Sequence, residues 1–186
     1  LDGAGLRRDR LRAFEGDEVS GTEQYDAIII GAGQAAVPLS RAFAEAGRKT
    51  ALIERAAVGG SCINWGCTPT KTMIASATLA HAARNSSDYG VNVGQVDVSL
   101  PGVRRRRDSI VSSFRESSRA RLEKTSGLDL IFGSAAFVGP KTVGVHENGG
   151  GSRTLSADWI VINTGAYPRV PSIPGLEGVP YLDSTS

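Results

Sequence analysis

The first half of the chain alternates short apolar runs of strand length with longer runs of helical periodicity. Residues 25–30 form a β-rich apolar run that suits a strand buried on both faces of a parallel sheet. Apolar residues at helical spacing follow at 37–47, and residues 50–54 predict a second strand. Residues 69–85 predict a closely packed, alanine-rich helix, and residues 102–126 predict a long surface helix.

The second half changes, after Gly127, from helical to alternating periodicity. Short strands are predicted in several places, separated by Gly-Pro and Gly-rich turns: residues 128–132, 135–138, 142–146, 153–155 and 159–163. The glycines at 149–151 have no following helix, so they predict a hairpin loop and not a second dinucleotide site. Before the long surface helix, residues 88–100 predict a loop with an extended piece at 89–93.

Composition fits one soluble globular domain with irregular ends. The 186 residues are 40% hydrophobic and 22% charged, and the net charge of +2 gives no global electrostatic case for nucleic acid. No apolar run approaches the length of a membrane span and no signal peptide is visible, so a cytoplasmic protein without a membrane partner is expected. Residues 1–22 predict a flexible tail, and residues 166–186 predict a Pro- and Gly-rich linker.

Positive charge is concentrated in the predicted surface helix. Residues 104–124 hold eight basic and three acidic residues. Arg104 with Asp108, and Arg119 with Glu123, are spaced at i, i+4 and predict weakly stabilising ion pairs. We interpret the basic residues as a solvated face. A patch for phosphate or an acidic partner is the alternative, because no interleaved aromatic residues mark a nucleic-acid surface.

The turn after the first strand carries a dinucleotide-binding pattern. Gly31 permits a tight turn, and Gly33 lets the backbone approach a pyrophosphate whose charge is met by the next helix N-terminus. Ala36 stands at the third glycine position. Glu54 ends the second strand, where its carboxylate can accept hydrogen bonds from ribose hydroxyls. An acid there argues against a 2′-phosphate, and hence against NADP at this site.

Both cysteines, Cys62 and Cys67, lie within residues 59–71. A disulfide between them would close so small a loop that it contributes only roughly 2 kcal/mol, so stability is a weak reason to form it. The spacing alone leaves a buried, inert pair as the alternative. A structural zinc site is disfavoured because the two histidines, His81 and His146, are distant and carry no ligand spacing.

A helix is predicted to start or to kink just after the second cysteine. Thr68 and Pro69 have the residue types of an N-cap and a first helical position. If the helix starts there, Cys67 lies at the positive end of its dipole, with the ammonium of Lys71 one turn on. Both effects lower the pKa of a thiol, so Cys67 is predicted to favour the thiolate. In a cytoplasmic protein we interpret the pair as catalytic rather than structural.

Residues 59–71, Gly-Gly-Ser-Cys-Ile-Asn-Trp-Gly-Cys-Thr-Pro-Thr-Lys, resemble the redox-active motif of the class I pyridine nucleotide-disulfide oxidoreductases. This family includes glutathione reductase, dihydrolipoamide dehydrogenase and mercuric reductase, and residues 65–71 look closest to mercuric-reductase-like flavoproteins. The resemblance runs from about Tyr25 to the last residue. It implies an α/β fold in which residues 23–165 form a Rossmann-like FAD-binding domain with a parallel sheet and an antiparallel β-meander, incomplete at the C-terminus.

The resemblance also implies roles for individual residues. The bound dinucleotide would be FAD, with Cys62 as the interchange thiol that attacks substrate, Cys67 as the flavin-proximal thiol and Lys71 as the cation near the flavin. The other residues expected to contact FAD are Gly31, Gly33, Gln34, Ala35, Glu54, Gly60, Ser61, Ala135, Thr164 and Gly165. Asn163 replaces the Ala frequently found before that Thr, and no metal site is expected.

The implied function is that of a FAD-dependent disulfide oxidoreductase in cell redox homeostasis. Electrons would pass from NAD(P)H through FAD to the Cys62–Cys67 disulfide, and on to a small-molecule disulfide or metal-ion substrate. The full-length enzyme would be a homodimer, and residues 166–186 would lead toward a missing NAD(P)-binding domain. The alternative is a truncated, non-catalytic FAD-binding module. The sequence does not distinguish NADH from NADPH or identify the substrate.

Overall fold

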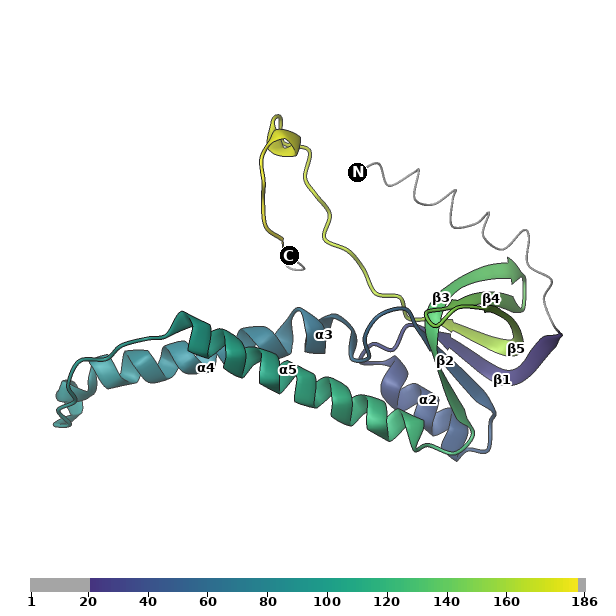
Figure 1. Cartoon of the computed structure of the whole chain (residues 1–186), viewed down its shortest axis with the longest axis horizontal. Coiled ribbons are helices and arrows are strands. Elements are labelled where there is room, and N and C mark those ends of the chain that lie inside the picture. The colour runs from purple at the N-terminus through teal and green to yellow at the C-terminus, as the bar shows by residue number, and fades with distance from the viewer. Residues whose placement is uncertain (1–20, 184–186) are drawn as a thin grey trace. The chain divides into compact units, whose positions relative to one another are not determined.

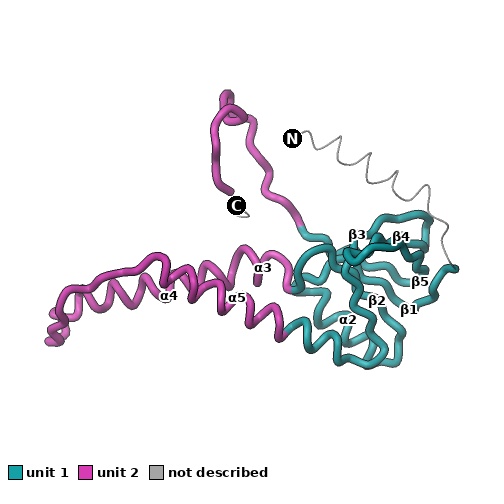
Figure 2. Tube along the Cα trace, in the orientation of Figure 1, with its two compact units in different colours: residues 1–58, 118–165 teal, residues 59–117, 166–186 magenta. Residues whose placement is uncertain are grey.

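The computed structural model describes residues 21–183 (Figure 1). In chain order the elements are β1 (Thr22–Ile30), α2 (Ala36–Glu45), β2 (Thr50–Glu54), α3 (Gly60–Asn64), α4 (Cys67–Arg84), η1 (Ser86–Tyr89), α5 (Leu100–Glu123), β3 (Leu128–Gly139), β4 (Thr142–Glu147), β5 (Ser152–Ile162) and η2 (Leu176–Gly178). Described residues 21–58 and 118–165 belong to unit 1, and 59–117 and 166–183 to unit 2 (Figure 2). The predicted tail lies outside the described residues except for Gly21 and for Thr22, which begins β1.

Unit 1 is built on a five-stranded sheet that closes on itself. β1 lies between β2 and β5 and runs parallel to both, while β3 runs parallel to β2. β4 pairs antiparallel with β3 and β5, which confirms the predicted meander beside a parallel sheet. The register sets Ile30 opposite both Ile53 and Ile162, so β1, β2 and β5 end at one edge of the sheet.

Successive side chains of β1 are buried on opposite faces of the sheet. Ile28 packs in a cluster formed by strand residues alone, whereas Ile29 packs in a second cluster with residues of α2 and with Leu122 of α5. Both isoleucines are fully buried. Burying one such side chain stabilises the folded state by about 1.5–3 kcal/mol. A parallel strand covered on both faces needs a continuous apolar run, which is the pattern that residues 25–30 show.

The predicted short strands of the second half are joined into longer ones. The two strands predicted on either side of Gly133 are one strand, β3, and the two on either side of Ser156 are one strand, β5. Gly133 does not interrupt β3 because it pairs with Glu147 of β4. A side chain at Gly133 would overlap the carbonyl oxygen of His146. Glycine here marks a close approach of two backbones rather than a break.

Unit 2 contains α3, α4 and most of α5. α4 begins at Cys67, two residues before the predicted start, and α3 is a helix that the sequence did not predict. The expectation of close packing is wrong for α4: within this fully described helix Thr72 is the one buried residue, while Ile74 is 57% and Leu79 72% exposed. Within the described chain the 3-10 helix η1 ends at Tyr89 and is followed by a left-handed Gly90, and residues 91–93 are assigned to no strand.

The long basic helix predicted from the sequence is present as α5, with one of its two ion pairs rearranged. Arg119 and Glu123 pair at 2.7 Å as expected, whereas Asp108 pairs with Arg107 at 2.6 Å. Exposed pairs of this kind contribute little to stability. No helix among residues 21–183 is both long enough and apolar enough to cross a bilayer.

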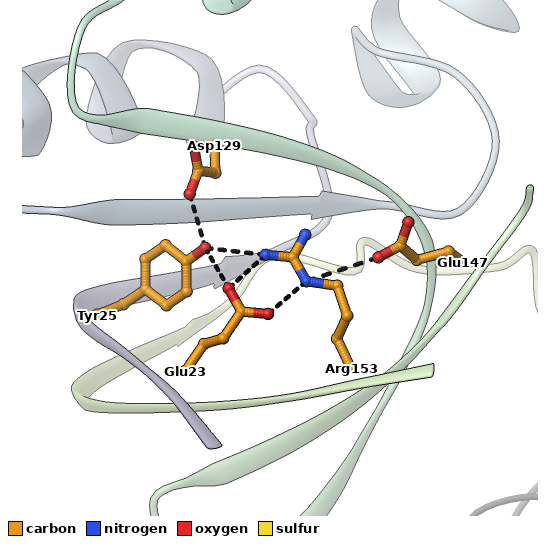
Figure 3. A network of polar contacts seen from close by, with 5 residues as sticks. All are labelled: Glu23, Tyr25, Asp129, Glu147 and Arg153. Atoms are coloured by element: carbon orange, nitrogen blue, oxygen red, sulfur yellow. Dashed lines mark hydrogen bonds and ion pairs between the residues drawn. The ribbon is translucent and has the colours of Figure 1, made fainter. Parts of the chain in front are cut away.

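Polar side chains from four strands form one network in unit 1 (Figure 3). Tyr25 donates to Asp129 at 2.6 Å and accepts from Arg153 at 3.2 Å. Arg153 also donates to Glu23 through Nε at 2.7 Å and Nη2 at 2.6 Å, and lies 3.6 Å from Glu147. The hydrogen bond from Arg153 lowers the pKa of Glu23, while burial, followed by the bond to Asp129, raises the pKa of Tyr25. The network ties β3, β4 and β5 to β1.

Removal of the Tyr25 hydroxyl is expected to lower the stability of the protein measurably. Tyr25→Phe keeps the buried ring but leaves Asp129 without this donor, so we expect the free energy of unfolding to fall by about 1–3 kcal/mol. Urea denaturation, monitored by circular dichroism, measures this free energy. Lys141→Met, which removes the exposed Lys141–Asp158 pair, is the control and should unfold with the parent. Equal urea midpoints for Tyr25→Phe and the parent would contradict the assigned role of the network.

Candidate functional site

In unit 1, the glycine loop between β1 and α2 is fixed by close backbone packing. Gly31 has a φ of 99° and donates its N–H to the carbonyl of Ile53 at 2.7 Å. A Cβ on Gly31 would overlap the carbonyl oxygen of Asn163 and lie 3.3 Å from the Cα of Thr164. Any larger residue would therefore push β1 away from the end of β5. The glycine loop and the turn at Thr164 can approach each other this closely only because residue 31 is glycine.

Glu54 lies against the same loop. Its Oε2 accepts a hydrogen bond from the N–H of Ala32 and its Oε1 from the N–H of Ala56, each at 2.8 Å. The residue is 9% exposed and ends β2, next to the end of β1. The structure thus places the predicted acid beside the glycine turn. A carboxylate has about four lone-pair positions, so two backbone bonds leave acceptor capacity for hydroxyl donors.

The start of α2 leaves its positive end open to an anion. The first turn is closed by bonds from the N–H groups of Ala36 and Val37 to the Gly33 carbonyl, at 3.1 and 3.2 Å. Among the described residues, no side chain caps this N-terminus and no acid lies in its first turn. Gln34 and Ala35 precede it and are exposed. Glycine, exposed backbone and an uncapped helix start fit the pyrophosphate of a dinucleotide.

Asn163 contributes a contact that the sequence analysis did not assign. Its Nδ2 donates to the carbonyl of Gly31 at 3.0 Å, and the same atom would lie 3.0 Å from a Cβ on Gly33. The side chain therefore bonds to Gly31 and occupies the space that a side chain at residue 33 would need. The available signal was the amide residue at the end of an apolar strand, at the position noted as a departure from Ala.

The remaining predicted residues of unit 1 lie at two separate places. Thr164 and Gly165 follow β5 and are exposed, and Gly165 has a φ of 72°. Ala135 lies in the meander, where it pairs with Val145 and packs against the strand-only core cluster. Thr164 is thus next to the glycine turn, whereas the contacts of Ala135 are with the core of the closed sheet.

In unit 2, the two cysteines stand on different helices joined by a tight turn. Cys62 lies within α3 and Cys67 is the first residue of α4. The N–H groups of Trp65 and Gly66 both donate to the carbonyl of Ser61, at 2.9 and 2.7 Å. Because the Ser61 carbonyl accepts both of these hydrogen bonds, α3 ends here and the backbone between the cysteines is irregular. Continuous helix would place two side chains five positions apart on different faces.

The turn brings the two thiols into hydrogen-bond contact. Both cysteines are free thiols; Cys62 is half-buried and Cys67 is exposed. The pKa of Cys62 is raised, first by the hydrogen bond to the Cys67 side chain and then by burial, while the positive charge of Lys71 acts in the opposite direction. Cys67 is the first residue of α4 and so lies at a helix N-terminus, as expected. Its preference for the thiolate stays a prediction.

The site residues that the sequence predicts are gathered in two sets, one in each unit (Figure 2). Unit 2 holds Gly60, Ser61, Cys62, Cys67 and Lys71, and unit 1 holds the rest. Sequence reasoning missed two further residues of unit 2, Asn64 within the cysteine segment and Arg115, which donates a hydrogen bond to it. Asn64 was part of the motif but had no role, and Arg115 belongs to the helix interpreted as a solvated face.

Comparison with known proteins adds a family and several relatives. A family model described as pyridine nucleotide-disulphide oxidoreductase matches residues 25–186. The chain is 38% identical over 162 residues to a mercuric reductase of Staphylococcus aureus, covering 87% of this chain and 29% of that protein. It is 36% identical over 158 residues to a dihydrolipoyl dehydrogenase of Chlorobaculum parvum, covering 85% of this chain and 33% of that protein.

A solved structure shows the same fold. It is the Cu(II) complex of a mutant of RclA, an HOCl-induced flavoprotein disulfide reductase from Escherichia coli. The TM-score is 0.72 at 32% sequence identity, and the match covers 88% of this chain and 34% of that one. The chain thus spans about a third of the length of the relatives it matches.

The thiol contact predicts opposite pKa changes in two variants of the dithiol protein. Cys67→Ala removes the hydrogen bond that raises the pKa of Cys62, so that pKa should fall toward the ordinary value. Lys71→Met removes the charge that lowers it, so the pKa of Cys62 should rise further. The pH dependence of Cys62 alkylation, followed by mass spectrometry of the Cys62 peptide, gives both values. A pKa of Cys62 unchanged in Cys67→Ala would show that the thiols do not interact.

Proposed function

The chain belongs to the pyridine nucleotide-disulphide oxidoreductase family, and from that premise we propose that it binds FAD and carries the redox-active disulfide of a flavoprotein disulfide reductase. FAD is the cofactor of this family and NAD(P)H its co-substrate. The observation that carries the proposal is the contact between Cys62 and Cys67. The short turn between α3 and α4 holds two thiols together where a disulfide adds little to stability, which favours a chemical use of the pair.

The residues of unit 1 are proposed to hold the adenosine and pyrophosphate portions of FAD. Gly31 and Gly33 permit close approach of the backbone, and the open N-terminus of α2 favours negative charge. Glu54, which already accepts from Ala32 of the loop, would accept from ribose hydroxyls. Further FAD contacts are proposed for Gln34, Ala35, Gly60, Ser61, Ala135, Thr164 and Gly165.

The cysteines are proposed to pass electrons by thiol–disulfide exchange. When bound and reduced by NAD(P)H, FAD would supply the two electrons that, with two protons, cleave the Cys62–Cys67 bond and give two thiols. The Cys62 thiolate then attacks a sulfur of the substrate disulfide, and one half of the substrate leaves as a thiol. Cys67 attacks the Cys62 sulfur of this mixed disulfide, which releases the second thiol and restores the Cys62–Cys67 bond. Lys71 would favour the thiolates through its charge.

The proposed substrate class is a small-molecule disulfide or a thiophilic metal ion. The names of the relatives support both, since they include a dihydrolipoyl dehydrogenase and a mercuric reductase. Two adjacent thiolates are also suitable ligands for a soft metal ion. A non-catalytic FAD-binding module is the competing hypothesis, and it differs in requiring no chemistry at Cys62 or Cys67.

The role of Glu54 is tested by charge reversal. Glu54→Lys puts a cation where a ribose acceptor is proposed, so we expect at least about a tenfold loss of FAD affinity, because charged hydrogen-bond partners contribute about 1.5–3 kcal/mol. Glu45→Lys makes the same change on the exposed end of α2 and is the matched control. Flavin absorbance after desalting measures retention. Equal retention by Glu54→Lys and Glu45→Lys would refute the role of Glu54.

The division of labour between the thiols is tested in the FAD-loaded protein. Cys62→Ser leaves Cys67 as the lone thiol, and if Cys67 is flavin-proximal its thiolate should give a long-wavelength charge-transfer absorbance at neutral pH. Cys67→Ser should give none. Each variant differs from the parent by the same sulfur-to-oxygen change, so each is the control for the other. Identical visible spectra would refute the assignment of roles, although not the disulfide.

A further inference from the structure

The helix that carries Cys62 is too short to hold its own shape. α3 has 5 residues, and helices of this length are not stable without tertiary contacts. It starts at Gly60 after the N-cap Gly59, and these two residues have φ angles of 59° and 107°, so the chain entering the helix adopts a backbone that favours glycine. Contacts from outside the helix must therefore set the position of Cys62.

Asn64 supplies a first contact, which lies within α3 itself. It is the last residue of α3 and is 8% exposed. Its Nδ2 donates at 2.9 Å to the carbonyl of Gly60, the first residue of the same helix. The side chain therefore spans α3 from end to end, with Cys62 midway between the two bonded positions.

Arg115 of α5 supplies the second contact. Its Nε donates to Oδ1 of Asn64 at 2.9 Å, across 51 positions of sequence. An amide whose oxygen is held in this way can present its NH₂ group in one orientation only. A guanidinium donor is also the stronger kind of hydrogen-bond donor. Arg115 thus orients the Asn64 amide so that its NH₂ group points to Gly60.

A second arginine of α5 holds the helix of the other cysteine. Arg106 Nη1 donates at 3.1 Å to the carbonyl of Thr72, the buried residue of α4. Both helices that bear cysteines are therefore hydrogen-bonded to α5. The two contacts differ in kind, because Arg115 acts on a side chain that braces α3, whereas Arg106 bonds backbone five residues after Cys67.

We propose that Arg115 is a positioning residue of the redox segment: through Asn64 it fixes α3, and so keeps the Cys62 sulfur within bonding reach of Cys67. The inference rests on the proposed redox function of the pair. Arg115 touches no reacting atom in this account. Its effect is on how often the two sulfurs meet, and so on the equilibrium between the dithiol and the disulfide.

The test is the dithiol–disulfide equilibrium of the purified chain in glutathione redox buffers, read by thiol trapping and mass spectrometry. Arg115→Met should lower the equilibrium constant for forming the Cys62–Cys67 disulfide by about threefold to tenfold, the usual size of coupling between contacting residues. Arg104→Met, the same change at an exposed position of α5, should leave the constant unchanged. Arg115→Lys, which keeps a cationic donor, should restore part of it.

The path through Asn64 is tested with a double variant. If Arg115 acts through Asn64, Arg115→Met should have no further effect in an Asn64→Ala background. Additive effects of the two substitutions on the equilibrium constant for disulfide formation would overturn this path. If that equilibrium constant is the same in Arg115→Met as in the parent, the positioning role is overturned while the redox function stays intact. Circular dichroism confirms that each variant is folded. A parent chain that forms no Cys62–Cys67 disulfide even in the most oxidising buffer would overturn the proposed function, and the positioning role with it.

Discussion

The parallel pairing of β1 with both β2 and β5 is the constraint on which unit 1 depends. It brings the ends of three strands to one edge, where the glycine turn, Glu54 and Asn163 meet. The pairing is possible because β1 is apolar on both faces, and the close approach is possible because Gly31 has no side chain. One packing requirement therefore assembles the proposed nucleotide site.

A different constraint governs the redox segment of unit 2. The second cysteine lies five positions after the first, and a continuous helix would point the two side chains in different directions. The Ser61 carbonyl ends α3, and α4 begins again at Cys67, so the two thiols meet. As a consequence, α3 is short and has little stability of its own. Hydrogen bonds from outside α3, of the kind that Arg115 makes to Asn64, offset that weakness.

The sequence predicted those features that depend on local pattern or a contiguous motif. The glycine turn, the acid at Glu54 and the meander were expected, because periodicity and turn chemistry act over a few residues. Features decided by distant contacts were missed. Gly133 continues a strand because β4 approaches it, and α4 looked packed from its alanines although most of it is exposed. Arg115 was indistinguishable from the other arginines of α5, since only its contact with Asn64 sets it apart.

The central claim is that a bound FAD and the Cys62–Cys67 pair share electrons. It is tested most directly by anaerobic titration of the oxidised, FAD-loaded chain with dithionite, with visible absorbance and free thiols recorded at each addition. The account predicts uptake of two electrons by the flavin and two more by the disulfide, with two new thiols per chain at Cys62 and Cys67. Uptake by the flavin alone, with no new thiols at full bleaching, would contradict it.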